Sequence, residues 1–262
     1  MKESLKALLL FANNMAYRLL DLRITKTPPF GGETCMTDPI AHEILVSVCK
    51  RTMTSENSLF NLVEAVRYVE INKIEGDIVE CGVWRGGSVI AILKTLLSIN
   101  STSREIYLYD TFEGMTDPQS VDRSMMGKFA SDLMARKSTK INSGHEAGVV
   151  AYASISDVQS GILEIPYPVD KVHLIVGDVT ETLRVHKHRK IAILRLDTDW
   201  YLSTKSELVH LWDLVSPGGI VIIDDYDYWQ GSRKAVDEFF AERNIQLFKM
   251  KMASGGRIIV KN

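Results

Sequence analysis

The stretch that most constrains the fold is residues 77–88, DIVECGVWRGGS. It begins with strand-forming apolar residues, and Glu80 stands where the strand should end. Three glycines, the first of them Gly82, allow a tight turn and a close approach of the backbone to a ligand. Ser88 then opens an apolar helix. A strand, a glycine-rich turn and a helix in this order predict an α/β fold with a ligand at the carboxyl end of the strand.

The spacing of these glycines indicates which ligand to expect. A dinucleotide-binding turn carries G-x-G-x-x-G and receives a pyrophosphate, whereas here an acid, Glu80, precedes Gly82 and Gly86. A carboxylate at this place suits a cationic ligand, and S-adenosylmethionine (SAM) carries both an ammonium and a sulfonium group. The pattern acid-x-G-x-x-x-G is typical of SAM-dependent methyltransferases of the Rossmann-like class. The alternative is a strand–helix turn whose glycines serve packing alone.

Composition bounds the class of protein. A chain of 262 residues allows one α/β domain with additions. A net charge of −2 argues against a nucleic-acid partner. The three cysteines have no metal-site spacing and fit a reducing compartment, so we expect a cytoplasmic protein. Apolar runs are too short for a membrane span.

The N-terminal residues 5–22 repeat leucines at roughly helical spacing and predict an amphipathic helix. This helix could dock on its own domain, pack against another subunit or lie on a membrane surface. A subunit contact or a lid is favoured, and membrane association is disfavoured because the segment has few basic residues.

The rest of the chain alternates helices and strands. We expect an N-terminal helical extension or lid over residues 1–70, and a methyltransferase domain over 71–262 with an insertion at about 115–168. The insertion is poorly periodic and is read as a lid over the acceptor substrate, with His145 a solvated loop residue. An SPGG turn is expected before the fifth strand. The mostly parallel, seven-stranded sheet is expected to end in an antiparallel pair over 244–250 and 255–262.

Two acids follow later strands of this sheet. Asp110 ends the strand at 104–110 and is placed to bind both hydroxyls of a ribose; a helix cap or turn acid is the alternative. Asp178 follows the strand at 171–178, where it could meet the amino group of an adenine or act as a helix N-cap. The sequence leaves these two roles of Asp178 open.

A second group of acids, Asp197, Asp199, Asp224 and Asp225, stands at the ends of the fourth and fifth strands. Adjacent carboxylates repel one another unless a cation lies between them. Oxygen ligands suit Mg²⁺ or Ca²⁺ rather than zinc, although such aspartates can also cap helices. A Mg²⁺ that binds two neighbouring hydroxyls would orient them and lower their pKa. Asp199 is then the candidate general base.

Five motifs occur in order between about Met53 and Phe240: VECGVWRGGS, YDTFEGM, GDVTETL, LRLDTDWYLST and PGGIVIIDDY. Together they resemble the macrocin O-methyltransferase family, which includes mycinamicin and novobiocin sugar methyltransferases. The resemblance implies a class I, SAM- and Mg²⁺-dependent enzyme and a homodimer or higher homo-oligomer. It implies Asp199 as the base and Asp197, Asp224 and Asp225 as metal ligands. It implies SAM contacts from Glu80, Gly82, Ser88, Asp110 and Asp178, with Thr54 or Ser55 near the methionine end.

The leading hypothesis is therefore an O-methyltransferase that acts on a sugar hydroxyl of a glycosylated natural product. A catechol-like or other small-molecule diol is the alternative acceptor, because it also presents two neighbouring oxygens. A non-catalytic nucleoside-binding protein has no need of the aspartate group. A NAD-dependent enzyme is disfavoured by the glycine spacing and by Glu80.

Overall fold

One seven-stranded sheet organises the computed structural model, which describes residues 38–135, 151–253 and 255–262. Its strands run in the order β3-β2-β1-β4-β5-β7-β6. The first five in this order are parallel, while β7 runs antiparallel to β5 and β6 antiparallel to β7. The mostly parallel seven-stranded sheet expected from the sequence is confirmed. In chain order the strands are β1 (Asp77–Cys81), β2 (Ile106–Asp110), β3 (Val172–Val176), β4 (Ile191–Leu196), β5 (Val215–Ile223), β6 (Met250–Lys251) and β7 (Arg257–Val260).

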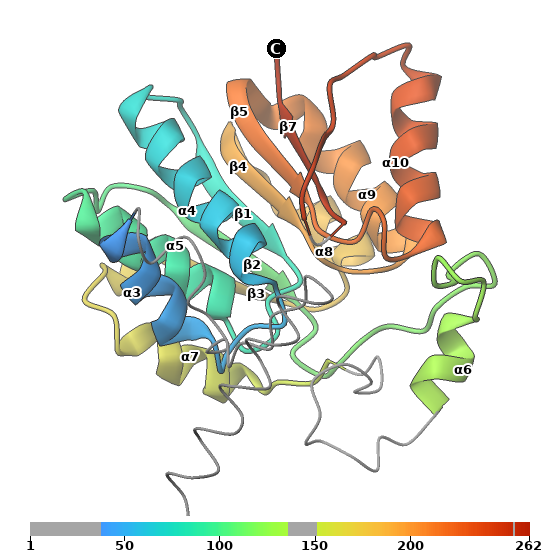
Figure 1. Ribbon diagram of the computed structural model, residues 1–262, viewed down its shortest axis with the longest axis horizontal. Helices are drawn as coiled ribbons and strands as arrows, with labels where there is room; N and C mark the ends of the chain where they lie inside the picture. The colour runs from blue at the N-terminus through green and yellow to red at the C-terminus, as the bar shows by residue number, and fades with distance from the viewer. Residues whose placement is uncertain (1–37, 136–150, 254) are drawn as a thin grey trace, which may run out of the picture.

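Helices cover both faces of the sheet (Figure 1). Helices α3, α4 and α5 pack against one another on one face, and α8, α9 and α10 lie on the other. Because successive strand residues point to opposite faces, Ile78 of β1 joins the first core and Val79 joins the second. The α-helices are α3 (Pro39–Val48), α4 (Glu56–Ile71), α5 (Gly87–Ser98), α6 (Ala130–Ala135), α7 (Ile155–Leu163), α8 (Val179–Val185), α9 (Tyr201–Leu211) and α10 (Gln230–Glu242), and 3-10 turns span η1 (Val169–Lys171) and η2 (Trp212–Leu214).

Two helices of the first face begin at residues whose side chains cap the helix N-terminus. Asp38 caps α3 by accepting from the Ala41 N–H at 2.8 Å, and Pro39 follows it. Ser55 is the N-cap of α4 and accepts from the Ser58 N–H at 3.3 Å. Thr54 is therefore free for a different role, which is described below.

The SPGG segment is not the turn that the sequence predicted. It lies inside β5, where Ile191 and Ile193 of β4 pair with Val215 and Ile220, so that β5 carries extra residues as a bulge. Gly218 has a φ of 78° and donates its N–H to the Lys261 carbonyl at 2.6 Å. The strand continues because the C-terminal residues satisfy the backbone of the bulge.

The first strand of the terminal pair is also shorter than expected. Only Met250–Lys251 pairs with β7, while the preceding Ile245 and Leu247 pack on the core without a strand partner. The antiparallel pairing itself is confirmed.

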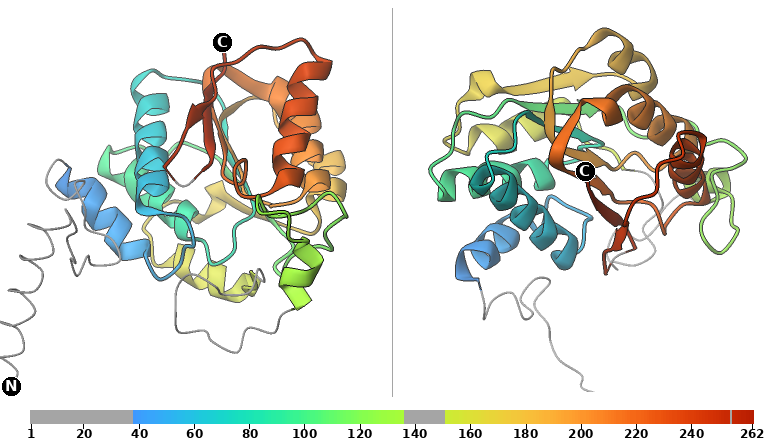
Figure 2. Two further views of the ribbon diagram at one scale, coloured as in Figure 1. Left: turned by 45° about the vertical axis from the view of Figure 1, so that its right-hand side comes forward. Right: turned by 90° about the horizontal axis from the view of Figure 1, so that it is seen from above.

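Two parts of the predicted insertion are described, one before residue 136 and one after residue 150, and both pack against the α/β domain (Figure 2). Its first part reaches the start of α9, where the Thr116 carbonyl accepts from Trp200 Nε1 at 2.9 Å. Ala130 of α6 packs with Trp200 and Trp229. Its second part forms α7, which lies beside α5. His145 and the predicted N-terminal helix lie outside the described residues.

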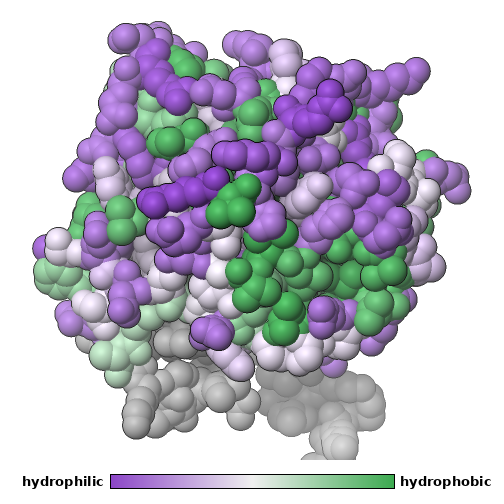
Figure 3. Space-filling model, turned by 180° about the vertical axis from the view of Figure 1, so that it is seen from behind, coloured by the Kyte–Doolittle hydropathy of each residue, from purple (hydrophilic) through white to green (hydrophobic). Residues whose placement is uncertain are grey.

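Seen from behind, the upper part of the surface is mostly hydrophilic, and apolar side chains gather in its lower half (Figure 3). Strand β3 forms one edge of the sheet, and its last residue, Val176, is 56% exposed.

Over the described residues, no helix combines the length and the apolar character that a membrane crossing needs.

Candidate active site

The glycine turn, residues 82–87, connects β1 to α5 at the carboxyl edge of the sheet. Gly82 has a φ of 85°, and a Cβ atom there would lie 2.0 Å from the Asp197 carbonyl oxygen. A side chain at this position is therefore excluded both by backbone conformation and by space. Ser88 is buried in the first turn of α5. The turn thus brings the end of β1 against the end of β4.

Asp110 holds this turn in place. Its Oδ2 accepts from the N–H groups of Val83 at 2.7 Å and Trp84 at 2.9 Å, and its Oδ1 accepts from the Phe112 N–H at 2.8 Å. The carboxylate therefore links the end of β2 to the glycine turn. Its predicted contact with a ribose stays a prediction.

Asp178 is the N-cap of α8. Its Oδ1 accepts from both the N–H and the hydroxyl of Thr180 at 2.8 Å. Of the two roles left open by the sequence, the capping role is observed. The adenine contact stays a prediction.

A buried arginine that the sequence reasoning missed lies beside Glu80. Arg195 of β4 is 2% exposed and is the register partner of Glu80 in the β1–β4 pair. Its Nη1 lies 2.8 Å from both Glu80 Oε1 and Asp197 Oδ2. Its Nη2 lies 3.1 Å from Asp224 Oδ2 and 2.9 Å from Thr54 Oγ1. A single arginine within the apolar run IAILRL was the available signal, because a buried guanidinium requires partners.

The four aspartates predicted to converge do so. We call them the acidic cluster: Asp197, Asp199, Asp224 and Asp225, at the carboxyl ends of the adjacent strands β4 and β5. Asp199 has a left-handed φ of 66° and donates its N–H to Asp225 Oδ2 at 3.0 Å. Its Oδ1 accepts from Trp229 Nε1 at 2.6 Å. The bond to Asp225 thus fixes the backbone of Asp199, and the bond from Trp229 fixes its side chain.

Burial governs the electrostatics of this edge. Desolvation, together with the charge of Asp197, raises the pKa of Asp199 and of Asp224 to about 7. Desolvation also raises the pKa of Glu80 to about 7, against the opposing charge of Arg195. Of the three acids that pair with the guanidinium, two keep one buried oxygen with no hydrogen-bond partner: Glu80 Oε2 and Asp224 Oδ1. The single positive charge of Arg195 therefore does not compensate the carboxylates that surround it.

A further buried acid, Glu207 of α9, lies behind the acidic cluster and was also missed. Glu207 is fully buried, and its Oε1 accepts from the Thr198 hydroxyl at 2.8 Å while its Oε2 has no partner. Desolvation raises the pKa of Glu207 to about 8. Through its bond to Thr198, Glu207 stabilises the backbone between Asp197 and Asp199.

The chemistry of the acidic cluster fits a hard divalent cation, because every donor is a carboxylate oxygen. The unpartnered Asp224 Oδ1 and the excess of carboxylates over guanidinium also favour a cation at this place. Within the part of the chain that the structure describes, however, no group of three or more His, Cys, Asp or Glu side chains is arranged to hold an ion. Two carboxylates of the acidic cluster, Asp197 and Asp224, pair instead with Arg195.

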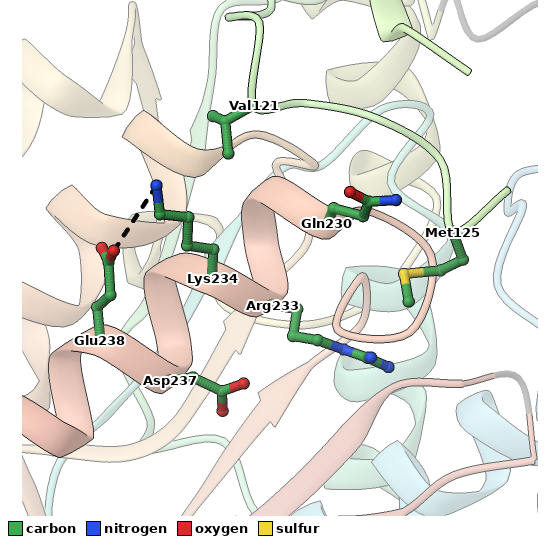
Figure 4. A pocket seen from close by; sticks show the side chains of 7 residues that line it. All are labelled: Val121, Met125, Gln230, Arg233, Lys234, Asp237 and Glu238. Atoms are coloured by element: carbon green, nitrogen blue, oxygen red, sulfur yellow. Dashed lines mark ion pairs between the residues drawn. The ribbon is translucent and has the colours of Figure 1, made fainter. Parts of the chain in front are cut away.

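A shallow groove of about 500 Å³ lies elsewhere, along α10 (Figure 4). Lys234 and Glu238 form an ion pair in it at 3.7 Å. The groove contains none of the predicted site residues. It is lined by Val121, Met125, Gln230, Arg233, Lys234, Asp237 and Glu238.

The sheet order and the glycine turn at its carboxyl edge define the class: this is the α/β fold of class I SAM-dependent methyltransferases. A family profile described as macrocin O-methyltransferase (TylF) matches residues 46–254. The chain belongs to this family, as the sequence motifs indicated.

Curated relatives and solved structures agree with this assignment. The chain is 34% identical to an 8-demethyl-8-(2,3-dimethoxy-alpha-L-rhamnosyl)-tetracenomycin-C 4'-O-methyltransferase of Streptomyces olivaceus, over 67% of this chain and 62% of that protein. It is 32% identical to the demethyldecarbamoylnovobiocin O-methyltransferase of Streptomyces niveus, over 74% of this chain and 69% of that protein. The structure of the O-methyltransferase NovP superimposes with a TM-score of 0.68 at 27% identity, and covers 81% of this chain and 82% of its own.

Proposed function

We propose that this protein is a SAM- and Mg²⁺-dependent O-methyltransferase that methylates a sugar hydroxyl of a glycosylated natural product. Membership of the macrocin O-methyltransferase family supports the reaction, and the names of the relatives support the acceptor class. The observation that carries the proposal is the acidic cluster, whose carboxylates exceed the single buried guanidinium and leave Asp224 Oδ1 without a partner.

The residues that would hold the ion are Asp197, Asp224 and Asp225. When bound, Mg²⁺ would act as a Lewis acid toward two neighbouring hydroxyls of the acceptor and lower their pKa. The Asp225 carboxylate also accepts from the Asp199 N–H, so it links the proposed ligands to the proposed base.

Asp199 is the group that would take the acceptor proton. Its Oδ1 is occupied by Trp229 Nε1, so Oδ2 is the atom left to accept the proton. SAM, when bound, would supply the methyl group from its sulfonium sulfur, which would leave as the thioether of S-adenosylhomocysteine, while Asp199 would keep the acceptor proton. The left-handed backbone of Asp199 and its bond to Trp229 hold the carboxylate at one place, which is what proton transfer requires.

The cofactor would lie along the glycine turn. Glu80, Gly82, Ser88, Asp110 and Asp178 are proposed to contact SAM, with Thr54 and Ser55 near its methionine end. The contacts of Asp110 to Val83 and Trp84 support this proposal, because they fix the backbone that a cofactor would approach. The cytoplasmic location and the homo-oligomer stay predictions.

Methyl transfer from SAM tests the proposal directly. The purified protein would be incubated with deoxysugar glycosides or with catechols, in Mg²⁺ and in EDTA. Transfer to a glycoside that stops in EDTA and returns with Mg²⁺ is the expected result. Transfer to catechols alone would reassign the acceptor, and equal transfer in EDTA would remove the metal from the proposal.

A further inference from the structure

Arg195 belongs to a strand that is otherwise apolar. The other residues of β4, Ile191–Leu196, are all aliphatic and buried, and on the same face as Arg195 lie Ile78 of β1 and Ile222 of β5. Placing a guanidinium there requires the removal of its hydration shell, which an aliphatic side chain would not require. A role in packing alone therefore does not account for an arginine at this position.

The contacts of Arg195 divide between the two halves of the site. On one side its guanidinium meets Glu80 Oε1 at 2.8 Å and Thr54 Oγ1 at 2.9 Å. On the other side it meets Asp197 Oδ2 at 2.8 Å and Asp224 Oδ2 at 3.1 Å. A planar fork of five N–H donors can serve four acceptors at once, which the single ammonium group of lysine does less well.

The guanidinium also determines which oxygens stay available. It occupies one oxygen of Glu80 and one of Asp224, and the second oxygen of each carboxylate is buried without a partner. The two unpartnered oxygens, Glu80 Oε2 and Asp224 Oδ1, belong to the cofactor half and to the acidic cluster respectively. Arg195 thus binds one oxygen of Glu80 and one oxygen of Asp224 and leaves the other oxygen of each without a bond.

We propose that Arg195 is a positioning residue that acts oppositely on the two halves of the site: it orients Glu80 and Thr54 for the cofactor, and it competes with a divalent cation for Asp197 and Asp224. The inference rests on the proposed function. If the guanidinium is removed, the cofactor half loses its anchor. The acidic cluster gains two free oxygens and loses a repelling positive charge, so a cation should bind it at least as well.

The test measures two affinities in three variants. Isothermal titration with S-adenosylhomocysteine reports the cofactor half, and Mn²⁺ binding followed by electron paramagnetic resonance reports the acidic cluster. The variants are Arg195→Met, Arg195→Lys and a control, Arg104→Met. Arg104 is also largely buried and pairs with Glu70 and the Gly76 carbonyl, remote from the acidic cluster.

In Arg195→Met we expect S-adenosylhomocysteine to bind about 10- to 100-fold more weakly, the usual effect of losing a residue that orients a ligand. We expect Mn²⁺ to bind equally or more tightly. Arg195→Lys, which keeps the charge but not the fork, should show the same signature more weakly. Arg104→Met should leave both affinities unchanged.

Two results would overturn the inference. One is unchanged binding of S-adenosylhomocysteine in Arg195→Met, and the other is a parallel loss of both ligands, which indicates a merely structural role. If circular dichroism shows that Arg195→Met does not fold, Arg195→Lys decides the question by the same two affinities. If the unaltered protein binds neither ligand, the proposed function itself fails, and the inference fails with it.

Discussion

The glycine turn and the acidic cluster stand at the same edge of the sheet, but their polar groups are satisfied to different degrees. At the glycine turn, the Asp110 carboxylate accepts from Val83, Trp84 and Phe112 of the chain itself. In the acidic cluster, carboxylates face one another, and Asp224 Oδ1 has no partner. The polar groups of the turn are therefore satisfied by folding, whereas the acidic cluster keeps a buried carboxylate oxygen that the described residues do not satisfy.

The substitution Asp199→Asn should have the largest effect. It removes the proposed proton acceptor but keeps the shape of the side chain, so turnover should fall by about 10² to 10⁴-fold. Binding of S-adenosylhomocysteine at the glycine turn should stay within a small factor. Methyl transfer and isothermal titration on the same preparation measure both quantities.

The matched control for this substitution is Asp213→Asn. Asp213 is exposed and pairs with Arg243 away from the site. Turnover in this control should equal that of the unaltered protein. If Asp199→Asn also turns over at that rate, the base is assigned to the wrong residue.

Two glycine substitutions test how closely the glycine turn packs on β4. Gly82 and Gly127 both have positive φ, but a Cβ at Gly82 would meet the Asp197 carbonyl, while a Cβ at Gly127 would have nothing within 4 Å. Gly82→Ala should lower the free energy of unfolding by about 3 kcal/mol or more. Gly127→Ala should cost only about 1–2 kcal/mol of backbone strain. Urea denaturation gives both values, and equal costs would show that the turn is not closely packed on β4.

The pH dependence of stability tests whether ionisation of the buried Glu207 destabilises the folded protein. The pKa of Glu207 is about 8 in the folded protein and about 4.3 when unfolded, so between these values the folded state binds more protons. Stability should therefore fall as pH rises through this window. Glu207→Gln cannot ionise, and its advantage over the unaltered protein should grow from pH 5 to 8 and then level off, at on the order of a few kcal/mol. A constant difference across this range would contradict the buried-acid account.

The smallest expected effect concerns the support of the glycine turn by α7. Asp157 accepts from Arg85 Nε at 3.0 Å and lies 3.4 Å from Arg51 Nη1. The hydrogen bond from Arg85 lowers the pKa of Asp157, so this contribution is present above about pH 4 and is lost as pH falls through the folded-state pKa. Asp157→Asn should cost about 0.2–1 kcal/mol at pH 7 and raise the KM for SAM by at most about fivefold. A loss of stability that persists at pH 2 would not come from this charge.

Much of the fold was predictable because local signals agreed with the tertiary structure. The strand before the glycine turn and the strand that ends at Asp110 could be predicted without knowledge of distant residues. The SPGG segment was mispredicted because its turn chemistry is overridden by pairing with Lys261, which lies far along the chain.

The site shows the same division between local and distant information. The convergence of the acidic cluster follows from the rule that parallel strands end at one edge. The partner of Glu80 does not follow from that rule, because it depends on the register that sets Arg195 beside it. Converging carboxylates require a compensating cation, and the chain itself provides one in the guanidinium of Arg195. That guanidinium leaves Asp224 Oδ1 unsatisfied, so the requirement is met only in part.

The most direct test of the account is to locate the ion. Crystals grown or soaked with Mn²⁺ would be measured for anomalous scattering. One peak is expected within coordination distance of the carboxylates of Asp197, Asp224 and Asp225, and no such peak is expected in Asp224→Asn crystals. A fully occupied Mn²⁺ elsewhere, with Arg195 alone between these aspartates, would contradict this expectation.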